Sequence, residues 1–185
     1  MSEPESIERF MTVCHGLTRP ENNYLGHALD IETFKNTGWS IEKHENTLQF
    51  LNQTLPVVIR VCSGGSSIYI VKRFEFDAHL QRSSVIAVSP ELPAYVYVKG
   101  SPESIKFLCK PNSIPKNFDA MCSRYSSEGH YVIALACREV DSVYLAQLGA
   151  LSRNQVETNL DFKGFLLFEN PIKKEAYPTF SALNG

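Results

Sequence analysis

Apolar side chains recur at two different spacings along this chain, and the change of spacing separates expected helices from expected strands. Near the N-terminus they stand three or four residues apart, which is the spacing of one helix face and predicts a helix over 6–17. The residues that carry this spacing are Ile7, Phe10, Met11 and Cys14. A second, shorter helix is expected over 31–36, with Gly38 as its stop signal.

Further along, the apolar residues form short strings rich in β-branched and aromatic side chains, which is typical of strands. The expected strands cover 47–51, 56–62, 67–76, 84–88, 95–99, 131–137 and 162–168. Further helices are expected over 101–109, 117–127 and 152–159. The sequence S-G-G-S at 63–66 predicts a hairpin turn. Consecutive hairpins predict an α/β fold in the two-layer sense, with a mainly antiparallel sheet flanked by helical hairpins.

The stretch Y-V-Y-V-K-G-S-P-E at 95–103 combines a buried strand, a lysine and a helix start. Gly100 lets the backbone turn sharply or approach a ligand closely. Ser101 can cap a helix, and Pro102 suits its first position. Lys99 would then lie beside a helix N-terminus, where an anion such as a phosphate can bind. The alternative is an ordinary strand-to-helix turn with a surface lysine.

Composition limits the function classes. The chain has 185 residues, of which 43% are hydrophobic and 21% charged, with a net charge of −2, which suits one globular domain. This balance argues against a nucleic-acid-binding protein, which would carry a basic stripe. No apolar run approaches the roughly 20 residues of a membrane helix, and the acidic N-terminus is not that of a signal peptide.

Neither a metal site nor an autonomous catalytic site is evident. The five cysteines show no C-x-x-C spacing, which favours a reducing compartment, and the histidines form no ligand cluster. Cys14 and His15 are adjacent, so on a helix they point about 100° apart and cannot form a thiolate pair by themselves. No nucleophile-elbow or P-loop motif is present. We therefore assign no catalytic residue and no metal ligand.

Several motifs carry a resemblance to a known family. K-G-S-P-E at 99–103 looks like the K-G-[AS]-P-E motif in the nucleotide-binding domain of P-type ATPases. The segment 72–86 resembles the F-x-F-x-x-x-L-Q-R-x-S-V pattern of the fifth P-type subfamily, type B, whose members are similar to lysosomal or endosomal polyamine transporters. Further matches to that subfamily occur in the same order at 11–17, 26–39, 128–136 and 162–170 and extend the resemblance over nearly the whole chain.

The resemblance implies a nucleotide site and assigns its residues. Phe76 would stack on adenine, which is worth roughly 1–3 kcal/mol per base. On the residues alone, Phe74 and Phe76 share one strand face and could both be core, but polar Asp77 follows Phe76 and favours exposure. Lys99 would line the base of the pocket and Gly100 would let the backbone approach. The full set of implied nucleotide-binding residues is Phe76, Gln81, Lys99, Gly100, Tyr131, Ile133 and Lys35.

Two of these positions depart from the family pattern. Tyr131 replaces an arginine that contacts the phosphates, and Lys35 replaces a glutamate that would face the adenine amino group. His27 also stands where an acidic residue is usual. The loss of a charge-assisted contact to phosphate should weaken affinity more than it disturbs the fold. Arg82 or Arg124 could compensate.

The expected function follows from the resemblance. The family's phosphorylated aspartate lies in D-K-T-G-T, which this chain lacks. We therefore expect residues 1–170 to be a nucleotide-binding domain that holds ATP, with Mg²⁺, for the phosphorylation and actuator domains of the same parent chain. Residues 171–185 would begin the connection to the phosphorylation domain. The parent would be an ATP-driven cation or polyamine transporter, with this domain on the cytosolic side of a lysosomal or endosomal membrane.

Two alternatives stay open. The chain could be a degenerate domain with little nucleotide affinity that acts as a structural or regulatory interaction module. An independent soluble enzyme is the third reading, and no catalytic constellation supports it.

Overall fold

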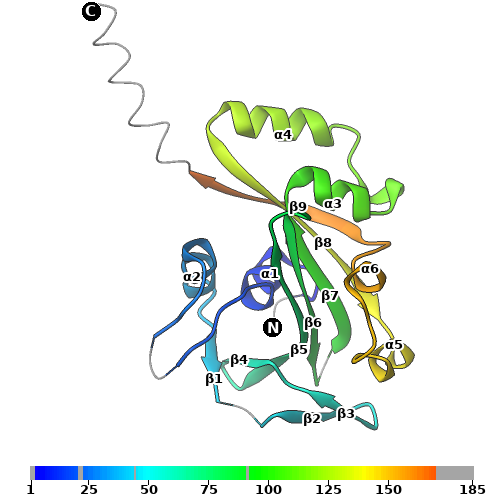
Figure 1. Cartoon of the computed structure of the whole chain (residues 1–185). Helices are drawn as coiled ribbons and strands as arrows, with labels where there is room; N and C mark the ends of the chain where they lie inside the picture. The colour runs from blue at the N-terminus through cyan, green and yellow to red at the C-terminus, as the bar shows by residue number, and fades with distance from the viewer. Residues whose placement is uncertain (1–2, 21–22, 44, 91, 170–185) are drawn as a thin grey trace, which may run out of the picture.

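The centre of the molecule is an antiparallel sheet (Figure 1). The computed structural model describes residues 3–20, 23–43, 45–90 and 92–169. Within these residues, the main sheet contains seven strands in the order β1-β4-β5-β6-β7-β8-β9, and every neighbouring pair is antiparallel. The strands of the main sheet are β1 (Ser40–Glu42), β4 (Ile59–Ser63), β5 (Ser66–Asp77), β6 (Arg82–Ser89), β7 (Leu92–Gly100), β8 (His130–Val140) and β9 (Asp161–Glu169). Strands β2 (Thr47–Phe50) and β3 (Gln53–Pro56) form a separate hairpin.

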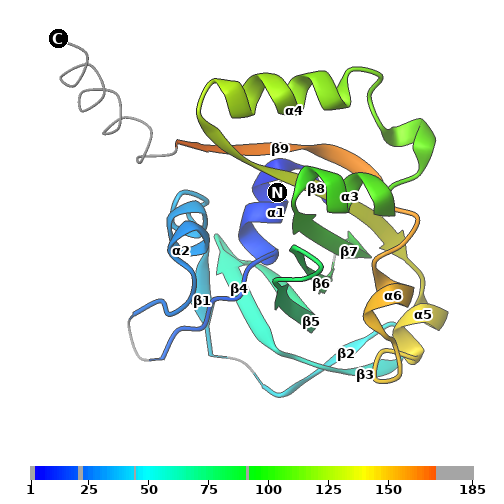
Figure 2. The same cartoon turned by 45° about the horizontal axis from the view of Figure 1, so that its top comes forward.

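Helices cover both faces of this sheet (Figure 2). They are α1 (Ile7–Val13), α2 (Ala28–Lys35), α3 (Pro102–Leu108), α4 (Phe118–Ser127), α5 (Ser142–Ala146) and α6 (Arg153–Val156), with a 3₁₀ turn at Pro111–Ser113. None of the helices in the described part of the chain is long and apolar enough to cross a membrane.

Two hydrophobic clusters form the core, one on each face. The first joins α1 and α2 to the sheet through residues such as Phe10, Phe34 and Tyr97. The second joins α3, α5, α6 and the β2–β3 hairpin to the opposite face through residues such as Ile105 and Val156. Because β7 lies in the middle of the sheet, its side chains are buried on both faces, as its unbroken β-branched and aromatic sequence predicts.

Local signals explain where several helices begin. The Ser6 hydroxyl accepts a hydrogen bond from the Arg9 amide at 3.3 Å, and the Ser101 hydroxyl accepts one from the Ser104 amide at the same distance. Pro102 occupies the first turn of α3, where its missing N–H costs nothing. These caps fix the entry of the chain into α1 and α3.

The expected mainly antiparallel α/β fold is confirmed, with three differences in detail. Helices on both faces make three layers where two were expected. The helix expected over 6–17 ends at Val13, because the chain turns there and the His15 ring binds the backbone on either side of itself. The strand expected over 56–62 is divided between the end of β3 and the whole of β4. The proposed connection at 171–185 lies outside the described residues.

Candidate functional site

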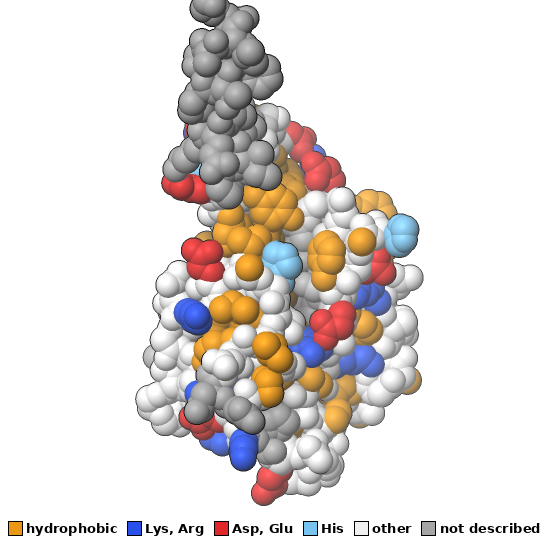
Figure 3. All heavy atoms as spheres, turned by 60° about the vertical axis from the view of Figure 1, so that its left-hand side comes forward, with side chains coloured by type: hydrophobic (Ala, Val, Ile, Leu, Met, Phe, Trp, Pro, Cys, Tyr) orange, Lys and Arg blue, Asp and Glu red, His pale blue; other side chains and the backbone are white. Residues whose placement is uncertain are grey.

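A cavity of about 170 Å³ opens beside α2, on the face of the sheet that holds the first core cluster. The turn after α1, the start of α2 and the adjoining ends of β5 and β6 form its walls. The lining residues are His15, Gly16, His27, Asp30, Arg73, Phe74, Glu75, Phe76, Ser83, Ser84 and Val85. Figure 3 looks onto the α2 side of the molecule, where hydrophobic side chains lie in patches between acidic, basic and histidine side chains.

A β-bulge places Phe76 at this cavity. Phe74 pairs with Ser84 and Asp77 with Arg82, so the two residues between them on β5 face the single residue Ser83 on β6. Bulges bend a strand and redirect its side chains, and they are frequent beside functional sites. Phe74 packs against the second core cluster, whereas Phe76 is 64% exposed. Phe76 is therefore not a core residue.

The turn that follows is held by the Asp77 side chain and packs against Gly100. The Asp77 carboxylate accepts hydrogen bonds from the amides of His79 (2.8 Å) and Leu80 (3.0 Å), and these bonds lower the pKa of Asp77. Gln81 adopts a left-handed conformation with φ 52°, and its side chain is exposed. A Cβ on Gly100 would lie 2.4 Å from the Gln81 carbonyl oxygen. Gly100 thus allows the turn to pack on the end of β7.

Lys99 points to the cavity side of the sheet and not to the N-terminus of α3. Its ammonium forms an ion pair with the Asp30 carboxylate of α2, and the two side chains are 17% and 15% exposed. The second oxygen of Asp30 accepts a hydrogen bond from the Gly16 amide at 3.1 Å. Asp30 and Glu75 are the two acidic residues among those that line the cavity, and sequence reasoning singled out neither of them.

A second cation lies at the cavity wall. The Arg73 guanidinium is 2.6 Å from the Glu75 carboxylate, and it also donates to the Leu17 carbonyl at 3.4 Å. The cavity therefore combines one exposed aromatic ring with one lining cation, Arg73, which is paired with Glu75. Lys99 does not line the cavity and lies behind Asp30, its carboxylate partner.

The wall formed by the turn after α1 is neutral near pH 7. His15 donates through Nε2 to the Thr12 carbonyl at 2.9 Å and accepts through Nδ1 from the Leu17 amide at 3.2 Å. Burial, assisted by the charge of Lys99, lowers the pKa of His15 to about 4. Burial also raises the pKa of Cys14 to about 12. The buried Cys14 side chain is therefore a neutral thiol near pH 7.

Of the seven residues implied by the resemblance, only Phe76 lines this cavity. Tyr131 and Ile133 lie on β8, on the same side as Leu135, which pairs with Lys99. Ile133 packs against the first core cluster, and Tyr131 is 55% exposed. Lys35 is exposed in the last turn of α2.

Neither arginine considered as a substitute for the missing phosphate contact lines the cavity. Arg82 is buried, with its guanidinium Nε 2.5 Å from the Glu157 carboxylate on the opposite face of the sheet. Arg124 lies on α4 and pairs with Glu128 at 3.7 Å. Arg73, which was not predicted, is the arginine at the cavity.

Metal binding is not supported by the side chains of the described residues. Among them, no group of three or more histidine, cysteine, aspartate or glutamate side chains is arranged to hold a metal ion. All five cysteines are free thiols. The arrangement suits a planar ligand that stacks on Phe76, offers a hydrogen-bond donor to Asp30 and carries negative charge toward Lys99 or Arg73.

The sequence of this chain is similar to known transport ATPases. Residues 63–175 match the family model described as the P-type ATPase cytoplasmic domain N. The chain is 35% identical over 181 residues to the probable cation-transporting ATPase 13A5 of Mus musculus, covering 94% of this chain and 15% of the relative. It is 32% identical over 188 residues to the polyamine-transporting ATPase 13A3 of Homo sapiens, with 89% and 15% covered. The vacuolar cation-transporting ATPase YPK9 of Saccharomyces cerevisiae is 30% identical over 200 residues, with 94% and 14% covered. The chain thus spans about 15% of the length of these curated relatives.

Proposed function

This chain belongs to the P-type ATPase family, in which it matches the cytoplasmic domain N, and from that premise we propose that it binds ATP at the cavity beside Phe76. In this proposal the domain presents the terminal phosphate of ATP to an aspartate in a phosphorylation domain of the same parent protein. The chain itself lacks the D-K-T-G-T motif, so the isolated domain should not turn ATP over.

The observation that carries the proposal is the exposed Phe76 ring beside the pair of Asp30 and Lys99. Adenine would stack on the ring, and such stacking contributes roughly 1–3 kcal/mol. The exocyclic amino group of adenine would donate to the Asp30 carboxylate. This carboxylate takes over the acceptor role that the family resemblance had assigned to position 35, which is Lys35 here.

The phosphates would extend from the base toward the cations of the site. Lys99 and Arg73 each hold a carboxylate partner, so phosphate binding requires these ion pairs to rearrange. That requirement, with Tyr131 in place of an arginine, favours weak binding. Mg²⁺ would be held by the phosphates and by the phosphorylation domain, because the described residues offer no metal-binding cluster of their own.

For the parent protein we propose ATP-driven transport of a cation or a polyamine. The names of the relatives support this class, since they include a polyamine-transporting ATPase and cation-transporting ATPases. We place the domain on the cytosolic side of a lysosomal or endosomal membrane. Two yeast relatives are named for the vacuole and the endoplasmic reticulum, and these names support an internal membrane for the parent without singling out the lysosome or endosome.

The test is a titration of the isolated domain with ATP, followed by amide chemical shifts. We expect a dissociation constant on the order of 0.1–10 mM, which corresponds to about −3 to −5 kcal/mol. Shifts should concentrate at Phe76, Asp30 and Lys99. Phe76→Ala should abolish binding and leave the melting temperature unchanged, because the ring is 64% exposed. Phe107→Ala is the matched control, since Phe107 is 87% exposed on α3, away from the cavity.

The second candidate is a degenerate domain that serves as an interaction module. The pairing of both cations and the identities of Lys35 and Tyr131 favour it. Absence of shifts at the cavity in saturating millimolar ATP would establish this alternative in place of ATP binding.

A further inference from the structure

A buried cluster of charged side chains lies on the opposite face of the sheet from the cavity, beneath the turn that follows Phe76. Glu157 follows α6 and is 1% exposed. Its carboxylate accepts hydrogen bonds from Arg82 Nε (2.5 Å), Ser84 Oγ (2.7 Å) and Arg153 Nη1 (3.2 Å). A buried carboxylate with this many donors is fully satisfied and holds its partners in fixed positions.

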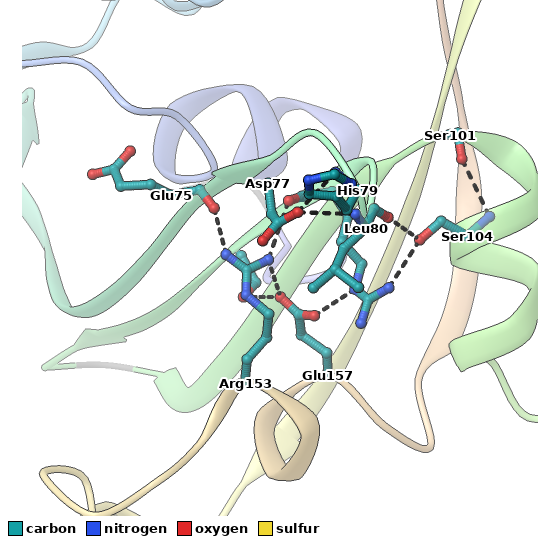
Figure 4. Close-up of polar contacts among 10 residues, drawn as sticks. Glu75, Asp77, His79, Leu80, Ser101, Ser104, Arg153 and Glu157 are labelled. Carbon is teal, nitrogen blue, oxygen red and sulfur yellow. Dashed lines mark hydrogen bonds and ion pairs between the residues drawn. The ribbon is translucent and has the colours of Figure 1, made fainter.

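Arg153 connects this cluster to the bulge that carries Phe76. Figure 4 shows Arg153 and Glu157 reaching from α6 toward the strand end that contains Glu75 and Asp77. The Arg153 guanidinium donates through Nη2 to the Glu75 carbonyl and through Nη1 to the Arg82 carbonyl at 3.1 Å. It therefore binds the backbone on both strands that flank the bulge.

The same guanidinium also packs on the strand. Its central carbon lies 5.5 Å from the centre of the Phe74 ring, which is the distance of a cation–π contact. A bulge withdraws backbone groups from the regular strand ladder, so a bonded side chain is needed to stabilise one arrangement. Arg153 supplies that side chain to the Glu75 carbonyl, one residue before Phe76.

We infer that Arg153 is a positioning residue for the Phe76 ring. Its guanidinium holds the bulge at 75–76 from the face of the sheet opposite the cavity, and the Glu157 carboxylate holds Arg153 in place. The inference rests on the proposed nucleotide binding. Arg153 does not touch the ligand in this scheme, so its loss acts only through the orientation of Phe76. A planar, forked guanidinium is required, because one ammonium cannot span both carbonyls.

The first experiment compares two arginine variants in an adenosine titration. Arg153→Met should weaken adenosine binding about fivefold, within the range of coupling energies between contacting residues. Arg138→Met is the matched control, because Arg138 also donates to carbonyls next to Glu157, those of Gln155 (3.2 Å) and Val156 (3.3 Å), but not to the bulge. It should leave adenosine affinity unchanged.

Arg153→Lys covers the case in which the methionine variant fails to fold. This variant keeps a cation beside Glu157, so it should fold. It lacks the two donor nitrogens of the guanidinium, so it should bind adenosine about threefold more weakly than the wild type. Amide hydrogen exchange without ligand should rise at residues 75–77 in either variant and stay unchanged at the centre of β7.

A double-mutant cycle separates positioning from general destabilisation. In a Phe76→Leu background, the Arg153 substitution should have no further effect on adenosine affinity. An equal loss in both backgrounds, or no loss in the wild-type background, would overturn the inference. If Phe76→Ala leaves ATP binding unchanged, the proposed function fails and this inference with it. If Phe76→Ala weakens binding and neither Arg153 variant does, this inference alone fails.

Discussion

Two groups of ion-paired side chains lie on opposite faces of the sheet, and their surroundings differ. Lys99 and Asp30 pair at the edge of the cavity, with side chains 17% and 15% exposed. Glu157, paired with Arg82 and Arg153 on the other face, has a fully buried side chain. The first pair lies beside the open cavity of about 170 Å³, whereas the second is enclosed by α6 and the sheet.

This difference in burial predicts different roles for the two ion-paired groups. The Lys99–Asp30 pair keeps some exposure, so exchange of a partner for a ligand should cost less there than at a pair closed off from solvent. A buried pair is costly to break, because removal of one partner leaves an uncompensated charge in the interior. On the proposed binding of a nucleotide, the pair at the cavity would rearrange, while the buried ion pairs of Glu157 would keep the strands in place.

The strongest test of this contrast removes the buried carboxylate. Glu157→Leu leaves Arg82 and Arg153 without their counter-ion and should lower the free energy of unfolding by about 3–5 kcal/mol. Urea denaturation followed by circular dichroism measures the change. Glu128→Leu is the control, because Glu128 is exposed and forms a loose ion pair with Arg124 at 3.7 Å. This substitution should lower the free energy of unfolding by less than about 1 kcal/mol. Equal losses in the two variants would contradict the contrast.

The next largest effect concerns the pH dependence of the cavity wall. His15 has a pKa of about 4 in the folded protein and near 6.5 when unfolded, so the unfolded chain binds its proton first as the pH falls. The contribution of neutral His15 to the free energy of unfolding should therefore be fully present above pH 6.5. The free energy of unfolding should decrease by about 3 kcal/mol as the pH falls toward 4.

Urea denaturation at a series of pH values measures this loss against His15→Asn, which should lack that part of the pH dependence. His79→Asn, at an exposed position in the β5–β6 turn, should behave as the wild type. A parallel decrease in wild type and His15→Asn would show that His15 is not the group responsible.

A smaller effect, on affinity, is expected from restoring the missing arginine. Tyr131→Arg should tighten ATP roughly tenfold and leave adenosine unchanged, because a charge-assisted bond to phosphate is worth about 1.5–3 kcal/mol. The exposed position makes the substitution tolerable. An unchanged ratio of ATP to adenosine affinity would mean that Tyr131 does not face the phosphates. Tyr131 lies about 14 Å along β8 from the level of Lys99, so the phosphates must extend in that direction.

The smallest expected effect comes from the partly buried pair of Lys99 and Asp30. Asp30→Asn should lower the free energy of unfolding by about 1 kcal/mol, less than the loss of Glu157, because the side chains keep some exposure and asparagine can still accept the hydrogen bond from the Gly16 amide. It frees the Lys99 ammonium for phosphate while keeping an amide oxygen for the base, so the ATP-to-adenosine affinity ratio should rise about two- to threefold. A large loss of stability would show that this pair, like the one around Glu157, is structural.

Sequence reasoning succeeded where structure is decided locally. The unbroken string at 95–99 predicted a strand covered on both faces, and Ser101 with Pro102 predicted the start of α3. The helix α5, only five residues long, was missed because so short a segment carries no periodic signal.

Features that depend on distant contacts could not be predicted from the residues alone. Arg82 and Glu157 are 75 positions apart, and nothing local marks them as partners. The bulge at 75–76 arises from strand register. Asp30 and Lys35 share one helix, yet they lie about 140° apart around its axis, so only the structure shows which of them lines the cavity.

The contact between Gly100 and the Gln81 carbonyl has an implication for how such domains change over time. Any side chain at position 100 would collide with the turn, whether or not a nucleotide is bound. A related domain without ATP binding would still need glycine there, because the packing of the turn does not depend on a ligand. The packing of the turn is therefore enough to explain the glycine of K-G-S-P-E, and a test of nucleotide binding has to address Phe76 and Asp30, the residues that the proposal places against the base.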